Sequence, residues 1–354
     1  METKRTRYLD VTRGIAIISV VLGHLNNFAI CRVVFTYHLP IFYLISGYFL
    51  ESRLAIPVFI RKKARRLLVP YYVSCLALIP CYMLRNLALG HDPLARFRDI
   101  IVEILYAAGD NWSKPFSIKA VGPLWFLWAL FWGELMLRLL LKCKASVRIA
   151  AVAAIFAVSC WSWRLIWLPL SIQAGGCALL FIYLGHLLRQ CLPTLTARPI
   201  SGEIKAAGAV LALAMWLWMV RNFTAFWLVH CEIGHGMADV LGSVSGCAIL
   251  VLVSRAVDVR LDGVAKLLAF LGRYSLLMLV LHFLETQCIP WKVLFKDCAA
   301  RFGLSKSPDL YLWFRIILKM VLLTGMTALL SRVPLVRRIY GYPPLKTEAP
   351  QDRA

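Results

Sequence analysis

Apolar stretches long enough to cross a lipid bilayer recur along the whole chain, from residue 11 to residue 331. Each holds about 17 to 25 residues, the length that a helix needs to cross ~30 Å of hydrocarbon. Of the 354 residues, 60% are hydrophobic and 16% are charged, and the mean hydropathy of +0.72 is far above that of soluble domains. The sequence therefore predicts an all-α fold, a polytopic membrane helical bundle. We expect residues 1–345 to form one integral membrane domain and residues 346–354 a short cytoplasmic tail.

About ten transmembrane helices are predicted, and their connecting loops differ in charge. The first is expected to be a retained helix and not a signal peptide, because no small-residue cleavage site follows it. Loops after even-numbered spans are rich in Lys and Arg, whereas cations in the other loops are offset by Asp and Glu. Cationic loops stay in the cytoplasm, so both termini are predicted to be cytoplasmic. The long loops 88–121 and 285–311 then lie outside and can roof a site. The predicted spans are 11–30, 34–51, 67–87, 122–141, 146–163, 171–189, 205–220, 236–254, 265–284 and 312–331.

The excess of basic residues indicates lipid rather than nucleic acid. Forty Lys and Arg oppose eighteen Asp and Glu, giving a formal net charge of +22. In a membrane protein, basic loops fix the orientation and contact anionic headgroups, so we expect anionic membrane lipids as partners and no nucleic acid. The eleven cysteines contain no CxxC pair and lie mostly in apolar runs, which is typical of small core residues. We expect no metal site, and the sequence indicates no particular oligomeric state.

The first span, in RYLDVTRGIAIISVVLGHLNNF, carries two ionisable residues, Arg13 and His24. An ionisable side chain in a span is costly, by about 2.5–3.5 kcal/mol, so each needs a partner or a function. Eleven residues at 100° each return to within about 20° of the starting direction, so both side chains share one face, roughly 16 Å apart. They can line one groove. Alternatively, Arg13 snorkels to the headgroups or pairs with Asp10, and His24 bonds to a neighbouring helix.

A second histidine, His38, begins the next span in YHLPIFYLISGYF, where Pro40 suits the first turn of a helix. Because a short loop joins the two spans, His24 and His38 are expected to lie near each other. Two imidazoles near one membrane face suit general acid–base chemistry close to neutral pH. The alternative is a hydrogen-bonded structural histidine. His282, deep in its span or near the outer end, can join the same polar centre.

Five cations precede the third span in FIRKKARRLLVPYY, residues 59–72. Such a cluster usually fixes orientation and binds anionic lipid, but it also suits a ligand bearing several phosphates. Lys63 and Arg66 lie three residues apart, on one face. A buried carboxylate, Glu134 in FLWALFWGELML, is interpreted as the partner of Arg138, four residues later.

Taken together, these segments resemble the acyltransferase-3 family of multi-spanning membrane acyltransferases. The resemblance spans nearly the whole length, in family order. Most specific is the combination of an arginine and a histidine separated by ten residues, the His-x-Pro span, the basic-Leu-x-x-Pro-Tyr entry and the Trp-Phe-Leu span. The segments that carry it are RYLDVTRGIAIISVVLGH, YHLPIFYLISGYF, KKARRLLVPYY, GPLWFLWALFWGEL, FIYLGHLLR and LGRYSLLMLVLH.

The resemblance implies about ten helices, an acyl-coenzyme A donor, usually acetyl-coenzyme A, and a hydroxyl of a carbohydrate or glycolipid of the cell envelope as acceptor. Arg13 and His24 correspond to the family's paired Arg and His, and Lys63 and Arg66 to its basic pair. On this basis Arg13, Lys63 and Arg66 are expected to anchor the donor. His24, aided by His38, is expected to act as general base or to take the acyl group transiently.

The chain also departs from the family pattern. Lys63 stands where an arginine is commonest, which keeps the charge but loses the planar fork that suits phosphate. The appended extracytoplasmic hydrolase-like domain of larger members is not expected, so one domain would complete the transfer. The expected location is a bacterial inner membrane. The main alternative is a transporter or flippase for an envelope lipid or small solute, and a third is a non-catalytic scaffold.

Overall fold

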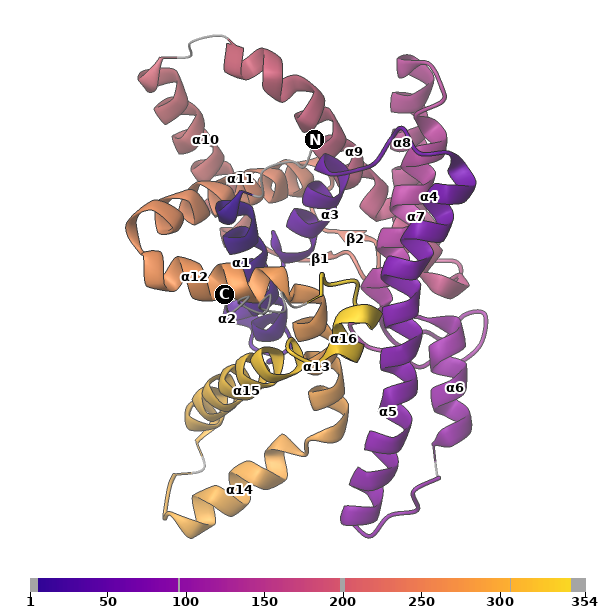
Figure 1. Cartoon of the computed structure of the whole chain (residues 1–354), viewed down its shortest axis with the longest axis vertical. Helices are drawn as coiled ribbons and strands as arrows, with labels where there is room; N and C mark the ends of the chain where they lie inside the picture. The colour runs from indigo at the N-terminus through magenta and orange to yellow at the C-terminus, as the bar shows by residue number, and fades with distance from the viewer. Residues whose placement is uncertain (1–5, 95, 198–200, 306, 345–354) are drawn as a thin grey trace, which may run out of the picture.

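The computed structural model describes residues 6–94, 96–197, 201–305 and 307–344, and they form a bundle that is almost entirely helical (Figure 1). The predicted tail, residues 346–354, lies outside the described residues. The elements are α1 (Arg7–Gly23), α2 (Phe28–Val34), α3 (His38–Tyr48), α4 (Ile56–Lys63), the π-helix η1 (Ala64–Leu68), α5 (Val69–Ala88), α6 (Phe97–Tyr106), α7 (Trp125–Leu140), α8 (Ala145–Ser162), the 3₁₀-helix η2 (Pro169–Ser171), α9 (Ile172–Ala197), α10 (Gly202–Arg221), β1 (Phe226–Trp227), β2 (Glu232–Ile233), α11 (Met237–Arg260), α12 (Asp262–Arg273), α13 (Ser275–Cys288), α14 (Trp291–Arg301), α15 (Pro308–Leu330) and α16 (Pro334–Ile339).

The helices confirm a polytopic membrane protein. Within the described ranges, seven helical segments are long and apolar enough to cross a bilayer, and α12 with α13, bent by 73°, make an eighth. Two further predicted spans appear as α1 with 17 residues and α7 with 16, at the lower limit of the length that crosses a bilayer. The weakest predictions from the sequence, the short spans 146–163 and 205–220, appear as α8 and α10.

Close helix crossings hold α1 at the centre of the bundle. In Figure 1, α1 lies between α12 and α3, and it contacts both as well as α11. A Cβ added at Gly14 would lie 2.0 Å from the carbonyl oxygen of Leu268, and one at Gly272 would lie 1.8 Å from that of Asp10. Only glycine permits this approach, as is common where membrane helices pack without a hydrophobic driving force. The crossing brings the end of α12 beside the first half of α1.

The first predicted span is wrong at its outer end, because α1 ends at Gly23 and not near residue 30. His24 is the C-terminal cap residue of α1, with φ −90° and ψ 12°. The chain then turns at Asn26, which has a left-handed φ of 57°, and the side chain of Asn27 caps α2 by accepting from Ile30 N at 3.1 Å. Asparagine tolerates the left-handed region and competes for backbone hydrogen bonds, which is why the helix stops here. His24 therefore stands at a helix end, where its ring has room.

The two ends of α1 contact segments that are predicted to lie toward opposite sides of the membrane. At its start, Arg7 Nη1 lies 2.6 Å from Asp262 Oδ1 in the predicted cytoplasmic loop between α11 and α12. At its end, Arg315, near the outer start of α15, donates to the carbonyl oxygens of Leu25 at 3.2 Å and His24 at 3.5 Å. Both contacts agree with the orientation that the charge distribution predicts.

The two long outer loops are partly helical. Residues 88–121 contain α6 and a short bridge between Trp112 and Ile118, and residues 285–311 contain α14. Their flanks reach the bundle centre through Asp110 and Trp291. Both loops thus contribute residues to the wall of the cavity described next.

Candidate active site

One large cavity, of about 1060 Å³, runs through the centre of the bundle. Its wall contains all five residues that the sequence singled out. At the end near the start of α1 it is strongly basic, and at the other end it is lined by histidines and aromatic side chains. The predicted site residues in its wall are Arg13, His24, His38, Lys63 and Arg66.

The basic end contains cations with and without a carboxylate partner. Arg13 lies 3.6 Å from Asp10, the pairing expected as an alternative, and its guanidinium also lies 5.8 Å from the centre of the Phe49 ring. Arg66 and Arg273 are both exposed in the cavity wall, and within the described part of the chain neither has a carboxylate in ion-pair range. Two uncompensated arginines facing one cavity favour an anionic ligand at this end.

Glu134 pairs across helices, so the predicted Glu134–Arg138 pair is wrong. Lys63 Nζ lies 2.6 Å from Glu134 Oε1, and Ser46 Oγ donates to the same oxygen. Arg138 instead donates to the carbonyl oxygen of Leu54, 2.5 Å from its Nη2. Packing of α3 and α4 against α7 brings Ser46 and Lys63 closer to Glu134 than Arg138 is, and spacing within one helix does not reveal this contact. Lys63 is therefore a buried, ion-paired member of the cavity wall.

A π-helical turn, η1, lies between Lys63 and α5. Its i→i+5 hydrogen bonds change the rotation per residue, and such turns are frequently found at functional sites. Lys63 at one end of the turn and Arg66 within it both line the cavity, although only Arg66 is exposed. The turn thus presents one paired and one unpaired cation to the same space.

His24 presents to the cavity a ring nitrogen, Nε2, that has no hydrogen-bond partner among the described residues. Its Nδ1 lies 2.8 Å from the carbonyl oxygen of Val20. A carbonyl oxygen only accepts hydrogen bonds, so in the neutral ring the proton is on Nδ1 and the lone pair is on Nε2. The His24 side chain is exposed to the cavity, and its Nε2 can therefore accept a proton there.

His38 is held in the same way but is more buried. Its Nδ1 lies 2.8 Å from the carbonyl oxygen of Val34, which again leaves the lone pair on Nε2. The ring is 6% exposed and lies 5.0 Å, centre to centre, from that of Phe35. His38 lines the same cavity as His24, so the structure brings the two predicted histidines to one space.

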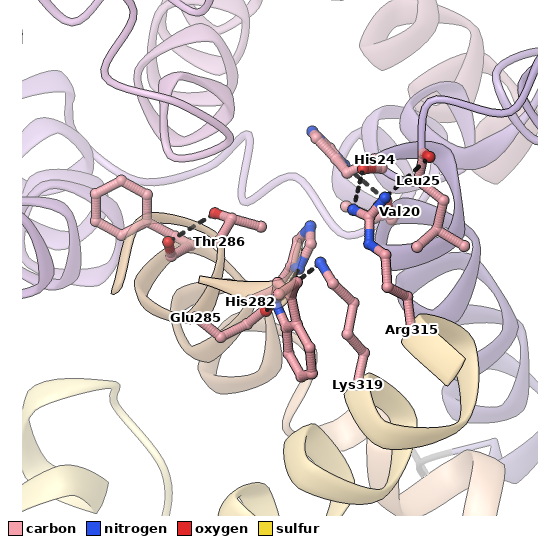
Figure 2. A network of polar contacts seen from close by, with 10 residues as sticks. Val20, His24, Leu25, His282, Glu285, Thr286, Arg315 and Lys319 are labelled. Carbon is pink, nitrogen blue, oxygen red and sulfur yellow. Dashed lines mark hydrogen bonds and ion pairs between the residues drawn. The ribbon is translucent and has the colours of Figure 1, made fainter. Parts of the chain in front are cut away.

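A buried polar network faces His24 from α13 and α15 (Figure 2). The prediction that His282 joins the polar centre of His24 is confirmed, since their ring centres are 5.0 Å apart. His282 Nδ1 lies 3.0 Å from Glu285 Oε1, and this oxygen also accepts from Lys319 Nζ at 2.5 Å. Trp291 Nε1 donates to the other oxygen, Glu285 Oε2, at 2.6 Å. The carboxylate is thus satisfied by three donors, and it fixes the ring of His282.

Sequence reasoning missed Glu285, Lys319 and Arg273. A signal existed for Lys319, because a lysine inside a span indicates either a buried partner or a function. Glu285 follows His282 by three residues, the spacing of neighbours on one helical face. Arg273 ends α12, and its place in the cavity depends on the glycine-mediated crossing of α12 with α1.

The far end of the cavity carries polar and aromatic side chains from the outer loops. Its wall includes Asn26, Asp110, Thr224 and Trp227. Asp110 Oδ2 lies 2.7 Å from His230 Nε2, and this hydrogen bond is the main cause that lowers the pKa of Asp110 below its ordinary value. An uncharged hydroxyl-bearing ligand would find both hydrogen-bonding groups and an aromatic face here.

The Asp110–His230 pair predicts an acid-labile outer loop. A carboxyl whose pKa is depressed on folding stabilises the fold above its unfolded pKa of about 3.9, and this contribution is lost as the pH falls through the folded value. Asp110→Asn is therefore expected to lose less stability than the wild type between pH 6 and pH 3. Melting temperatures in detergent at both pH values measure this, with Asp297→Asn, in the exposed part of α14, as the control. If the wild type and Asp110→Asn lose the same stability on acidification, the Asp110–His230 hydrogen bond does not stabilise the fold.

Comparison with known proteins identifies the class. The family described as an acyltransferase domain, acyltransferase-3, matches residues 6–331, and the chain therefore belongs to this family. The chain is also similar to the nodulation protein NolL of Sinorhizobium fredii (strain NBRC 101917 / NGR234), with 32% identity over 145 residues. That match covers 37% of this chain and only 35% of NolL. No solved structure matches the chain.

Proposed function

We propose that this acyltransferase is an O-acyltransferase of a bacterial inner membrane. It moves an acyl group, most simply acetyl, from acyl-coenzyme A in the cytoplasm to a hydroxyl of a carbohydrate or glycolipid acceptor on the other side. The observation that carries the proposal is one cavity whose wall contains, at one end, arginines with no carboxylate partner among the described residues and, at the other end, His24. Positive charge that suits a nucleotide and an imidazole that can take a proton from a hydroxyl thus lie in the wall of one cavity.

The donor fits the basic end of this cavity. Coenzyme A bears several phosphates on one end and a thioester at the tip of a long thin arm. Arg66 and Arg273 are suited to hold the phosphates, because guanidinium groups bind phosphate by two parallel hydrogen bonds. Arg13 and the Lys63–Glu134 pair lie along the wall beside them. The arm then extends along the cavity toward His24.

The chemistry places the acceptor hydroxyl between His24 and the thioester. His24 Nε2 takes the hydroxyl proton while the oxygen attacks the thioester carbon, so that a C–O bond forms and the C–S bond breaks. The proton then passes from His24 to the departing thiolate, which leaves as the thiol of coenzyme A. A transient acyl-histidine would use the same nitrogen in two steps, with the histidine attacking first. In either route the buried ring of His282, held by Glu285, packs against the ring of His24.

A label-transfer experiment tests the proposal. The purified full chain is reconstituted in vesicles and given radiolabelled acetyl-coenzyme A together with envelope glycans from the source cells. Label in the glycan supports the proposal. A transporter or flippase, the alternative, would use the same cavity for passage. Binding without transfer, together with uptake of solute or movement of lipid, would establish it and overturn the acyl-transfer proposal.

Arg273 gives a sharper test of the donor end. Arg273→Ala is expected to raise the KM for acetyl-coenzyme A about tenfold with little change in kcat, because the lost phosphate contact is made equally in the ground and transition states. Steady-state kinetics at saturating acceptor measure both constants. Arg260→Ala, which removes an exposed arginine from the end of α11 outside the cavity wall, is the matched control. A donor KM that stays at the wild-type value in Arg273→Ala would place the phosphates elsewhere.

A further inference from the structure

The chain continues beyond the last long helix into a short segment that returns to the cavity. This C-terminal strap, residues 334–343, consists of α16 and the turn that follows it. It lies beyond residue 331, where the match to the acyltransferase family ends. The sequence placed this segment at the end of the predicted membrane domain without assigning it a role, and the structure gives it a defined place.

Local chemistry fixes the shape of the strap. Pro334 occupies the first helical position, where its missing N–H is harmless. Gly341 follows the cap residue with a left-handed φ of 69°, and Tyr342 N donates to the carbonyl oxygen of Arg337 at 2.8 Å. This is the six-residue hydrogen bond of a Schellman ending, which turns the chain sharply back.

Arg337 ties the two ends of the strap to the bundle. Its Nη1 donates to the carbonyl oxygen of Ser331 at 2.6 Å and to the hydroxyl of Tyr274 at 2.9 Å. Its Nε and Nη2 both donate to the carbonyl oxygen of Pro343, at 2.7 Å from Nε. The side chain is buried, and its donors are engaged within the protein. Arg337 therefore holds structure together and is not itself available to a ligand.

Two tyrosines of the strap attach it to neighbouring helices. The hydroxyl of Tyr340 lies 2.9 Å from Ser74 Oγ on α5. The hydroxyl of Tyr342 accepts from Leu277 N at 3.2 Å, one of the first-turn amides of α13 that have no partner within the helix. The Tyr342 ring also lies 4.7 Å, centre to centre, from that of Tyr274. The tyrosines are only partly buried, and their remaining surface faces the cavity.

The strap lies at the basic end of the cavity. The same wall contains Arg66 and Arg273, which are both exposed and have no carboxylate in ion-pair range among the described residues. Aromatic rings beside uncompensated guanidinium groups are suited to a flat heteroaromatic base that carries phosphates. The strap residues in the wall are Arg337, Tyr340, Gly341, Tyr342 and Pro343.

We propose that the C-terminal strap forms one wall of the subsite for the nucleotide end of the coenzyme A donor, and that Arg337 is the positioning residue that holds this wall. The inference rests on the proposed function and adds a part to it that lies outside the family-matched region. Tyr340 and Tyr342 supply apolar ring surface to the base, while Arg66 and Arg273 hold the phosphates. Arg337 acts only through them.

A comparison of two donors tests the strap. Acetyl-coenzyme A carries the nucleotide, whereas S-acetylpantetheine has the same thioester and arm without it. Arg337→Ala is expected to raise the KM for acetyl-coenzyme A about tenfold, the effect of losing one base contact, and to leave kcat and the KM for S-acetylpantetheine unchanged. Tyr342→Ala is expected to do the same. Arg338→Ala, the exposed neighbour outside the cavity wall, is the control with wild-type kinetics.

Three results would overturn the inference. If both donors lose activity equally, Arg337 serves the fold alone. If the KM for acetyl-coenzyme A does not change, the nucleotide does not touch the strap, and if it falls, the strap blocks the entrance.

Binding of coenzyme A to the full chain, measured by calorimetry without acceptor, separates this inference from the proposed function. A wild-type protein that neither binds coenzyme A nor transfers label overturns both. A wild-type protein that binds it, with Arg337→Ala and Tyr342→Ala binding equally well, overturns the strap alone. Weaker binding by both variants supports the inference.

Discussion

His24→Gln is expected to lower kcat for acyl transfer by about 10²–10⁴-fold, the usual contribution of a general base. Glutamine keeps a hydrogen-bonding side chain of similar size, so it can still donate to the carbonyl oxygen of Val20, but it has no nitrogen lone pair to accept a proton. The loss should appear in kcat with either acetyl-coenzyme A or a nucleotide-free donor, because the base acts on the acceptor hydroxyl and not on the donor's nucleotide.

The matched control is His91→Gln. His91 lies in an exposed loop outside the cavity wall, so its replacement should leave kcat unchanged. Correct insertion of the His24 variant is checked by its melting temperature. A correctly inserted His24→Gln protein that transfers acyl groups at the wild-type rate would contradict the assigned role.

Glu285→Ala is expected to destabilise the protein by about 3–5 kcal/mol, the cost of removing one partner from a buried ion pair. Lys319 is fully buried and Glu285 is its carboxylate partner, 2.5 Å from Nζ. Removing the carboxylate leaves the ammonium group, the His282 Nδ1 proton and the Trp291 indole N–H without their acceptor. Unfolding followed in detergent against a denaturant measures the loss.

Two comparisons sharpen this result. Glu203→Ala, at the exposed start of α10, should cost no more than about 1 kcal/mol, the scale of a helix-end charge. The double variant Glu285→Ala/Lys319→Met should recover part of the lost stability, because no unpaired charge stays buried. A single variant as stable as the wild type would show that the network does not hold α13 to α15.

The fold could be predicted well from the sequence because local composition is enough to identify membrane-spanning helices. Continuous apolar runs and the asymmetry of Lys and Arg depend on no distant contact, and even the short spans α8 and α10 were recovered. The predicted end of the first span lies several residues beyond the end of α1, because apolar residues continue past Gly23. The turn is set by Asn26, and Asn27 caps the next helix.

Only those features of the site that depend on the geometry of one helix could be predicted from the sequence. The shared face of Arg13 and His24 follows from helical geometry, and the structure places both side chains in one cavity wall. The partner of Glu134, Lys63, is brought by packing of α4 against α7, so spacing within α7 pointed to the wrong residue. Arg273 reaches the cavity because α1 and α12 cross closely at Gly14 and Gly272. These glycines are far apart in the chain, and a single sequence does not reveal that they meet.

The central claim is that a thioester entering between Arg66 and Arg273 reaches His24 through one cavity. A cryo-electron microscopy structure of the full chain with a non-transferable acetyl-coenzyme A analogue, in which a methylene group replaces the thioester sulfur, tests it most directly. The account predicts phosphates at the two arginines and the acetyl carbon within reach of His24 Nε2. An analogue bound with its acetyl group outside the cavity, or with packed side chains between that group and His24, would contradict it.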